Sequence, residues 1–156
     1  FLNGWTFEGL WVTFTAAAAW GGITSSQRVA FDWLAVVGLV LWAVGFAFEV
    51  VADLQKSRFK ADPANEGRFI NTGLWSKSRH PNYFGEIVLW IGVALIALPT
   101  FQGWQWIAII SPLFVTLLLT RVSGVPMLEK KADGKWGGQA DYEEYKRTTP
   151  VLIPRP

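Results

Sequence analysis

Residues 87–120 contain no charged side chain, and they decide the class of fold. Their 34 residues read IVLWIGVALIALPTFQGWQWIAIISPLFVTLLLT. One straight helix of this length would measure about 50 Å, whereas the hydrocarbon core of a bilayer is about 30 Å thick. Pro99 and Gly103 interrupt the run and indicate a turn. The stretch therefore predicts two membrane-spanning helices, over residues 82–98 and 104–120.

Two earlier stretches have the same character. Residues 9–27 and 33–48 hold no charged side chain, and the apolar pattern of residues 31–52 contains Asp32 near its start and Glu49 near its end. Each is long enough to cross a bilayer as a helix. We therefore predict two further spans, over residues 9–27 and 31–52, with a short turn at residues 28–32.

The 14 Lys and Arg residues are unevenly distributed along the chain. One precedes residue 53, six lie in residues 53–86, none in 87–120 and seven in 121–156. The positive-inside rule then places a loop over residues 53–81, which we expect to contain no long helix, and a tail over residues 121–156 on the cytoplasmic side. The prediction is an all-α integral membrane bundle of about four transmembrane helices with a polar cytoplasmic tail. The alternative is a soluble helical bundle with unusually apolar helices.

The tail itself has a mixed pattern. Residues 129–133 indicate a helix that continues out of the fourth span, with breaks at Gly134 and at Gly137 and Gly138. Residues 141–147 predict a short polar helix.

Composition excludes several classes of function. The chain has no Cys, one His and a formal net charge of +2. A disulfide scaffold and a zinc–cysteine site are excluded, a transition-metal site is not expected, and the small net charge gives no reason to expect a nucleic-acid partner. There is no glycine-rich dinucleotide fingerprint and no P-loop, so a nucleotide would bind in another mode at the membrane interface. The expected partner is the lipid bilayer, and the oligomeric state is left open.

The densest cluster of reactive side chains lies in residues 73–86, where the basic loop enters the third span. The sequence there is GLWSKSRHPNYFGE, and its candidate side chains are Lys77, Arg79, His80, Asn82 and Glu86. A helix N-terminus with neighbouring cations suits an anion, and an ionisable group at membrane depth marks a functional site by default. Each residue alone would also fit an interfacial anchor, a cap or an ion pair. Together they favour a binding site.

Two smaller clusters are weaker candidates. Glu49 and Asp53 are four residues apart and share one helix face, where they would accept ribose hydroxyls or hold the basic loop. Tyr142 and Tyr145 would stack on a flat ring or dock the tail.

The motif of residues 73–86 resembles the signature of the steroid 5α-reductase C-terminal family, and most closely a bacterial branch of membrane proteins. The same branch is similar in four further runs, RFKADPAN at 58–65, SGVPMLEKK at 123–131, YEEYK at 142–146 and TPVLIP at 149–154. The resemblance covers residues 31–156 clearly and residues 1–30 weakly. The short piece Arg-His-Pro-x-Tyr is also shared by isoprenylcysteine carboxyl methyltransferases and phospholipid methyltransferases.

This resemblance implies an integral, multi-pass membrane enzyme of lipid metabolism, in the bacterial inner membrane, that uses NADPH to reduce an activated C=C bond. The substrate would be a hydrophobic steroid- or lipid-like enone. In characterised steroid reductases a Glu and Tyr pair in earlier helices supplies the proton. We therefore expect this chain to be the C-terminal, cofactor-binding part of a longer protein. Its catalytic residues are left open, with Tyr83 and Glu86 as candidates.

The resemblance also implies roles for individual residues. Asn82 would hold the nicotinamide carboxamide, with Tyr83 and Glu86 on the same wall. Asp53 matches a cofactor-binding aspartate, whereas Glu49 stands where reductases often have Asn. The remaining cofactor-binding candidates are the phosphate partners Arg58, Lys60 and Arg68, the motif residues Arg79 and His80, and Arg121, Tyr142 and Tyr145, which would close over the cofactor.

Two alternatives belong to other classes. One is a membrane methyltransferase that holds S-adenosylmethionine with the same motif, although such enzymes usually carry acidic pairs where this chain has Glu129-Lys130-Lys131. The other is a non-catalytic sterol- or lipid-binding protein. The sequence does not separate NADPH from NADH, although its many Lys and Arg residues favour the phosphorylated form.

Overall fold

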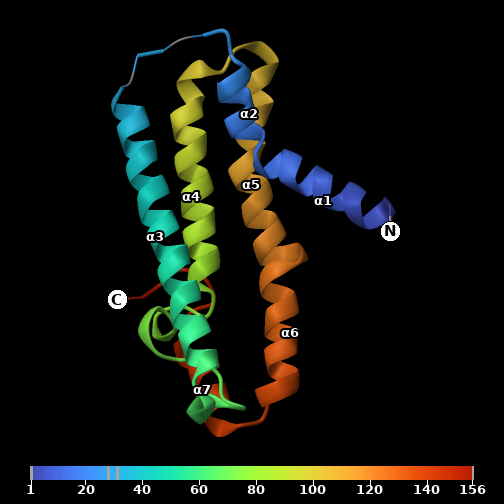
Figure 1. Ribbon diagram of the computed structural model, residues 1–156, viewed down its shortest axis with the longest axis vertical. Helices are drawn as coiled ribbons and strands as arrows, with labels where there is room; N and C mark the ends of the chain where they lie inside the picture. The colour runs from blue at the N-terminus through green and yellow to red at the C-terminus, as the bar shows by residue number, and fades with distance from the viewer. Residues whose placement is uncertain (1, 28, 31, 156) are drawn as a thin grey trace. The chain divides into compact units, whose positions relative to one another are not determined.

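The computed structural model describes residues 2–27, 29–30 and 32–155, and all regular structure within them is helical (Figure 1). The predicted all-α class is confirmed. The chain divides into two compact units, Phe1–Val44 with Ile87–Leu117 and Gly45–Glu86 with Leu118–Pro156. Arg28 and Phe31, which belong to the predicted turn and second span, lie outside the described residues.

Three helical segments are long and apolar enough to cross a membrane, among the residues described. The first is α3 (Trp33–Ala61), and the second is α4 (Pro81–Ala97) with the short turn η3 (Leu98–Thr100). The third comprises η4 (Gly103–Ile109), α5 (Ile110–Leu117), the π-helical turn η5 (Leu118–Val122) and α6 (Gly124–Trp136). The protein is thus a multi-pass membrane protein, and the predicted span over residues 82–98 lies within one residue of α4.

The predicted single span over residues 9–27 is wrong. The chain there forms two helices, α1 (Leu2–Thr15) and α2 (Ala17–Thr24), which diverge in Figure 1. At the break, the buried Ser111 hydroxyl of α5 donates a hydrogen bond to the carbonyl of Thr15. A side chain that takes a backbone carbonyl interrupts the hydrogen-bond ladder of a helix and bends it. The structure therefore has three spanning segments in its described part, where the sequence predicted about four.

The second span continues further than predicted. The expectation of no long helix after residue 53 is wrong, because α3 continues to Ala61. Residues 53–61 contain no Gly or Pro, and Arg58 and Lys60 in the last turn favour the negative end of the helix dipole. The helix ends where Asp62, which precedes Pro63, adopts an extended conformation (φ −84°, ψ 116°).

The fourth predicted span also continues past its predicted end at Thr120, through η5 into α6. The predicted helix over residues 129–133 is confirmed as part of α6, but the predicted break at Gly134 is wrong. The helix ends at Trp136, and Gly138 then adopts a positive φ of 82° that favours glycine. The predicted polar helix is confirmed as α7 (Ala140–Thr148).

Close contact between α3 and α4 in the first unit depends on glycine. A Cβ added at Gly92 would lie 2.5 Å from the backbone N of Trp42 and 2.6 Å from the carbonyl O of Gly38. Lipid tails provide no hydrophobic drive for membrane helices to associate, so their association depends on close packing. Small residues at a helix crossing let the two backbones approach closely enough for that packing. A larger side chain at this crossing must push the two helices apart.

We predict that Gly92→Ala destabilises the protein by about 1–3 kcal/mol. The added methyl group overlaps backbone atoms of α3, and backbone atoms cannot rotate aside as a side chain can. The measurement is thermal unfolding in detergent. Gly134→Ala is the matched control, since nothing lies within 4 Å of an added Cβ there, and it should be neutral or slightly stabilising. Equal stability of the two variants would contradict the assigned crossing.

Candidate functional site

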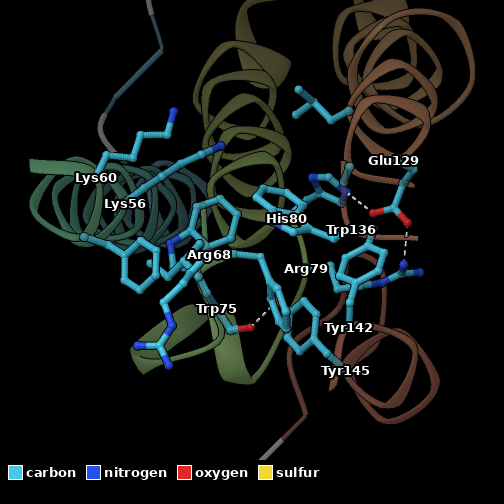
Figure 2. Close-up of a pocket in the computed structure, with 15 residues that line it drawn as sticks. Lys56, Lys60, Arg68, Trp75, Arg79, His80, Glu129, Trp136, Tyr142 and Tyr145 are labelled. Atoms are coloured by element: carbon cyan, nitrogen blue, oxygen red, sulfur yellow. Dashed lines mark hydrogen bonds and ion pairs between the residues drawn. The ribbon is translucent and has the colours of Figure 1, made fainter. Parts of the chain in front are cut away.

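The second unit contains a cavity of about 140 Å³, shown in Figure 2. Its wall comes from the polar end of α3, the loop after it, the residues before α4, and the helices α6 and α7. The lining residues are Lys56, Phe59, Lys60, Arg68, Phe69, Ile70, Trp75, Arg79, His80, Leu128, Glu129, Ala132, Trp136, Tyr142 and Tyr145. Segments far apart in the sequence therefore converge on one cavity in the second unit.

One carboxylate holds two residues of the motif in place. Glu129 on α6 accepts a hydrogen bond from Arg79 Nη1 with one oxygen, and its other oxygen lies 2.7 Å from His80 Nε2 (Figure 2). Because a carboxylate only accepts, His80 Nε2 carries the proton of this bond. His80 is buried, and its ring stacks on Tyr83 with ring centroids 5.6 Å apart.

An aromatic cluster forms another wall. Phe69 contacts the rings of Trp136, Tyr142 and Tyr145, with centroids 5.2 to 5.9 Å apart. The Tyr145 hydroxyl donates to the carbonyl of Trp75 at 2.6 Å, and the Tyr142 hydroxyl donates to Asp133 at 3.1 Å. Both tyrosine hydroxyls therefore hold α7 in place, and only their ring faces are available to a ligand.

Burial sets the protonation of these tyrosines. It raises the pKa of Tyr142 and of Tyr145 above the ordinary value, and the hydrogen bond to Asp133 raises the pKa of Tyr142 further. On the exposed face, Asp133 also accepts from Lys146 at 2.6 Å, which raises the pKa of that ammonium group. All three groups keep their protons at physiological pH.

The loop of residues 62–80 is anchored from both sides. The Trp75 indole donates to the carbonyl of Ala52 on α3 at 2.9 Å. The buried Ser78 hydroxyl donates to the carbonyl of Leu152 at 2.8 Å, and the Arg79 amide donates to the carbonyl of Pro150 at 2.9 Å. The C-terminal segment thus fixes the backbone of the motif.

Three cations on the cavity wall form no ion pair within the described part of the chain. Lys56, Lys60 and Arg68 form no ion pair with any residue that the structure describes. The Lys56 ammonium instead lies 4.6 Å from the centre of the Trp75 ring, at cation–π distance. Positive charge is therefore available to a ligand here.

A second group of candidates lies beside the cavity, on α3 and α4. The Asn82 amide Nδ2 donates to Asp53 Oδ1 at 3.1 Å, and Asn82 Oδ1 is buried without a hydrogen-bond partner in the described part of the chain. Glu49 and Asp53, four residues apart on α3, and Glu86 on α4 add three carboxylates to this group. The Tyr83 ring packs against Gly124. A Cβ added at that glycine would lie only 2.9 Å from Tyr83 Cε2.

The structure brings most predicted site residues together, in two groups. The cavity wall includes Lys60, Arg68, Arg79, His80, Tyr142 and Tyr145. The neighbouring group is Glu49, Asp53, Asn82, Tyr83 and Glu86. Arg58 and Arg121 are exposed and do not line the cavity. Arg58 points elsewhere because it lies on the continuous helix α3, where Lys56 and Lys60 share the cavity-facing side.

Sequence reasoning missed Lys56, Trp75, Glu129 and Trp136 as wall residues. A signal for Glu129 was present. Val125, Leu128, Glu129 and Ala132 recur at the spacing of one helix face, so Glu129 is a lone carboxylate in a stripe that packs inward. Its partners, 49 and 50 residues earlier, carry no sequence signal.

Known proteins and protein families share parts of this sequence. A family described as "Protein of unknown function (DUF1295)" matches residues 1–149, almost the whole chain. The chain belongs to this family.

Among curated proteins, this chain is similar to steroid and sterol reductases and to a probable O-methyltransferase. The chain is 29% identical to a steroid 5-alpha-reductase of Arabidopsis thaliana over 126 residues, 80% of the chain and 42% of the relative. It is 33% identical to a delta(14)-sterol reductase of Saccharomyces cerevisiae over 139 residues, 83% of the chain and 30% of the relative. It is also 32% identical to a probable O-methyltransferase of Ustilaginoidea virens over 90 residues, 58% of the chain and 31% of the relative.

These relationships confirm the predicted resemblance to the steroid 5α-reductase family. The chain spans less than half the length of the curated relatives it matches. No solved structure matches it significantly.

We predict that Glu129→Gln destabilises the protein by about 2 kcal/mol, because it leaves the largely buried Arg79 guanidinium without its anion. The side chains of Arg79 and Glu129 are 13% and 22% exposed. Glu144→Gln is the matched control, since its partner Arg147 and Glu144 itself are 73% and 57% exposed, and it should change stability by less than about 0.5 kcal/mol. Chemical unfolding in detergent measures both, and equal effects would contradict the clamp.

Alkaline pH should destabilise the protein through the tyrosines of α7. Their folded-state pKa is raised, so above about pH 10 the unfolded chain loses these protons while the folded chain retains them, and unfolding becomes more favourable. The unfolding free energy should be flat below about pH 10 and fall above it. In Tyr142→Phe/Tyr145→Phe the fall should be smaller, although Lys146 still contributes in the same direction. An unchanged slope would show that these hydroxyls are not buried.

Proposed function

We propose that this chain is the cofactor-binding part of a membrane-embedded reductase that uses NADPH to reduce an activated C=C bond in a steroid- or lipid-like enone. In this proposal the second unit faces the cytoplasm of a bacterial inner membrane. The similarity to two sterol reductases supports the reductase class. The charge of the cavity supports NADPH as the cofactor.

The balance of charge on the cavity wall carries the proposal. The lining contains four basic side chains, Lys56, Lys60, Arg68 and Arg79, and one carboxylate, Glu129. NADPH is a polyanion with a pyrophosphate and a further phosphate, so it gains Coulomb energy from this excess of positive charge. S-adenosylmethionine carries a positive sulfonium and would be disfavoured by the same wall.

The residues around the cavity also fit a ligand with polar groups. Asn82 Oδ1, His80 Nδ1 and Arg79 Nε are buried and have no hydrogen-bond partner in the described part of the chain. Buried polar groups are normally paired, so such atoms indicate partners that a ligand supplies. The cavity of about 140 Å³ is smaller than a typical ligand pocket and has room for one part of a dinucleotide.

Asn82 is suited to hold the nicotinamide. Its Nδ2 already donates to Asp53, which fixes the orientation of the amide and leaves Oδ1 to accept a hydrogen bond from a ligand carboxamide. NADPH supplies a hydride when bound. Tyr83 and Glu86, on the same turn of α4, are the groups beside Asn82 that could hold a proton.

A methyltransferase is the second candidate, because one relative is a probable O-methyltransferase. Its matched region covers less of this chain than those of the two sterol reductases. Direct binding of the two cofactors separates the classes.

The test is calorimetric titration of the purified chain in detergent with NADPH and, separately, with S-adenosylmethionine. We expect NADPH to bind and Lys60→Gln/Arg68→Gln to weaken it by tenfold to a hundredfold, as loss of charge-assisted hydrogen bonds should. Lys130→Gln/Lys131→Gln is the control, because both lysines are exposed on α6 and neither lines the cavity. Tight S-adenosylmethionine binding without NADPH binding would overturn the proposal.

A further inference from the structure

We propose that the face of α1 that carries Glu8 binds a further membrane helix, one with a basic side chain at the depth of Glu8. The C-terminal end of α1 packs on α5. There the carbonyl of Thr15 accepts a hydrogen bond from Ser111, and the rings of Phe14 and Phe114 lie 5.3 Å apart. Every residue from Glu8 to Phe14 is exposed, where α1 runs away from α5 (Figure 1).

The contact with α5 places Glu8 at membrane depth. Ser111 and Phe114 lie in the middle of the uncharged residues 104–120, so the C-terminal end of α1 is near the middle of the bilayer. Glu8 precedes Thr15 by two helical turns, which is about 10 Å along the helix axis. Half of the hydrocarbon core measures about 15 Å. The backbone of Glu8 therefore lies within the hydrocarbon region at any tilt of α1.

The Glu8 carboxylate has no partner within the part of the chain that the structure describes. It forms neither a hydrogen bond nor an ion pair there. Ionisable side chains at membrane depth are costly, and they almost always face protein or a water-filled cavity and pair with another group. The exposed neighbours Leu10 and Val12 are suited to lipid, whereas a carboxylate is not. The position of Glu8 therefore indicates that protein covers this face of α1.

The same face carries a second unpaired polar group. Thr15 lies seven residues after Glu8 and shares its side of the helix. Thr15 is 9% exposed, and its hydroxyl makes no hydrogen bond in the described part of the chain. The Thr13 hydroxyl, in contrast, donates to the carbonyl of Gly9 at 2.7 Å. A Cβ added at Gly9 would meet nothing within 4 Å, so a second helix has room to approach the backbone of α1 closely.

Charge indicates the kind of helix that fits this face. A carboxylate forms its strongest hydrogen bonds with a basic side chain. This chain has one basic residue, Arg28, before residue 53 and none in residues 87–120. Its apolar stretches therefore offer no cation that a second copy could place beside Glu8 at membrane depth. The partner that complements Glu8 is a membrane helix of different sequence that brings its own lysine or arginine.

The experiment uses the purified chain in phosphatidylcholine vesicles and two synthetic transmembrane peptides. Both are leucine–alanine helices, and they differ only in having arginine or leucine at the central position. Energy transfer from the tryptophans of the chain to a dansyl group on the peptide measures binding. We expect the parent chain to bind the arginine peptide at least fivefold more tightly than the leucine peptide, as polar contacts between model membrane helices do.

Glu8→Leu should bind the two peptides with affinities within twofold of each other, because it removes the carboxylate that recognises arginine. Glu66→Leu is the matched control, since Glu66 is an exposed carboxylate in the polar segment after α3, and it should keep the preference of the parent chain. Equal binding of the two peptides by the parent chain, or a preference for arginine that survives Glu8→Leu, overturns the proposal.

Energy transfer between labelled copies of the chain tests the other occupant of this face. We expect no self-association that depends on Glu8. Self-association that Glu8→Leu abolishes would make a second copy the occupant and would overturn a partner of different sequence. Either result leaves the proposed function standing, because Glu8 does not line the cavity.

Discussion

The cost of placing charge in a bilayer is the constraint on which this structure depends. An ionisable side chain at membrane depth is expensive, so residues 87–120 carry none and the basic residues gather in two polar segments. Those segments fold together as one compact unit with parts of α3 and α4. Concentrating cations there produces a wall with more positive charges than its single carboxylate, Glu129, can neutralise. Under the proposed function, this distribution imposed by the membrane is what attracts an anionic cofactor.

Much of the fold could be predicted because its signals are local. The start of α4 at Pro81 and its length follow from composition and from the fixed φ of proline. Where a predicted helix boundary was wrong, the observed boundary is set by a tertiary contact or by helix propensity that continues past the predicted end. Ser111 interrupts the helix near Thr15 from almost a hundred residues away in sequence. Charged residues after Asp53 suggested a loop, although lysine and arginine near a helix C-terminus favour the helix.

The candidate site was less predictable than the fold. The motif of residues 73–86 could be recognised as a cluster, but the Glu129 carboxylate that fixes Arg79 and His80 comes from another helix. The family resemblance implied that Arg58 and Arg121 contact the cofactor, yet both are exposed and neither lines the cavity. Charge is readable from sequence, whereas the direction in which a side chain points depends on the exact helix boundaries.

A structure of the purified chain with NADPH bound tests the central claim most directly, that the membrane-imposed clustering of cations forms a nucleotide site. We expect phosphate oxygens within hydrogen-bonding distance of Lys60 or Arg68 and the nicotinamide carboxamide at Asn82. Phosphates bound outside the cavity, or a cavity wall unchanged and empty at saturating NADPH, would contradict it.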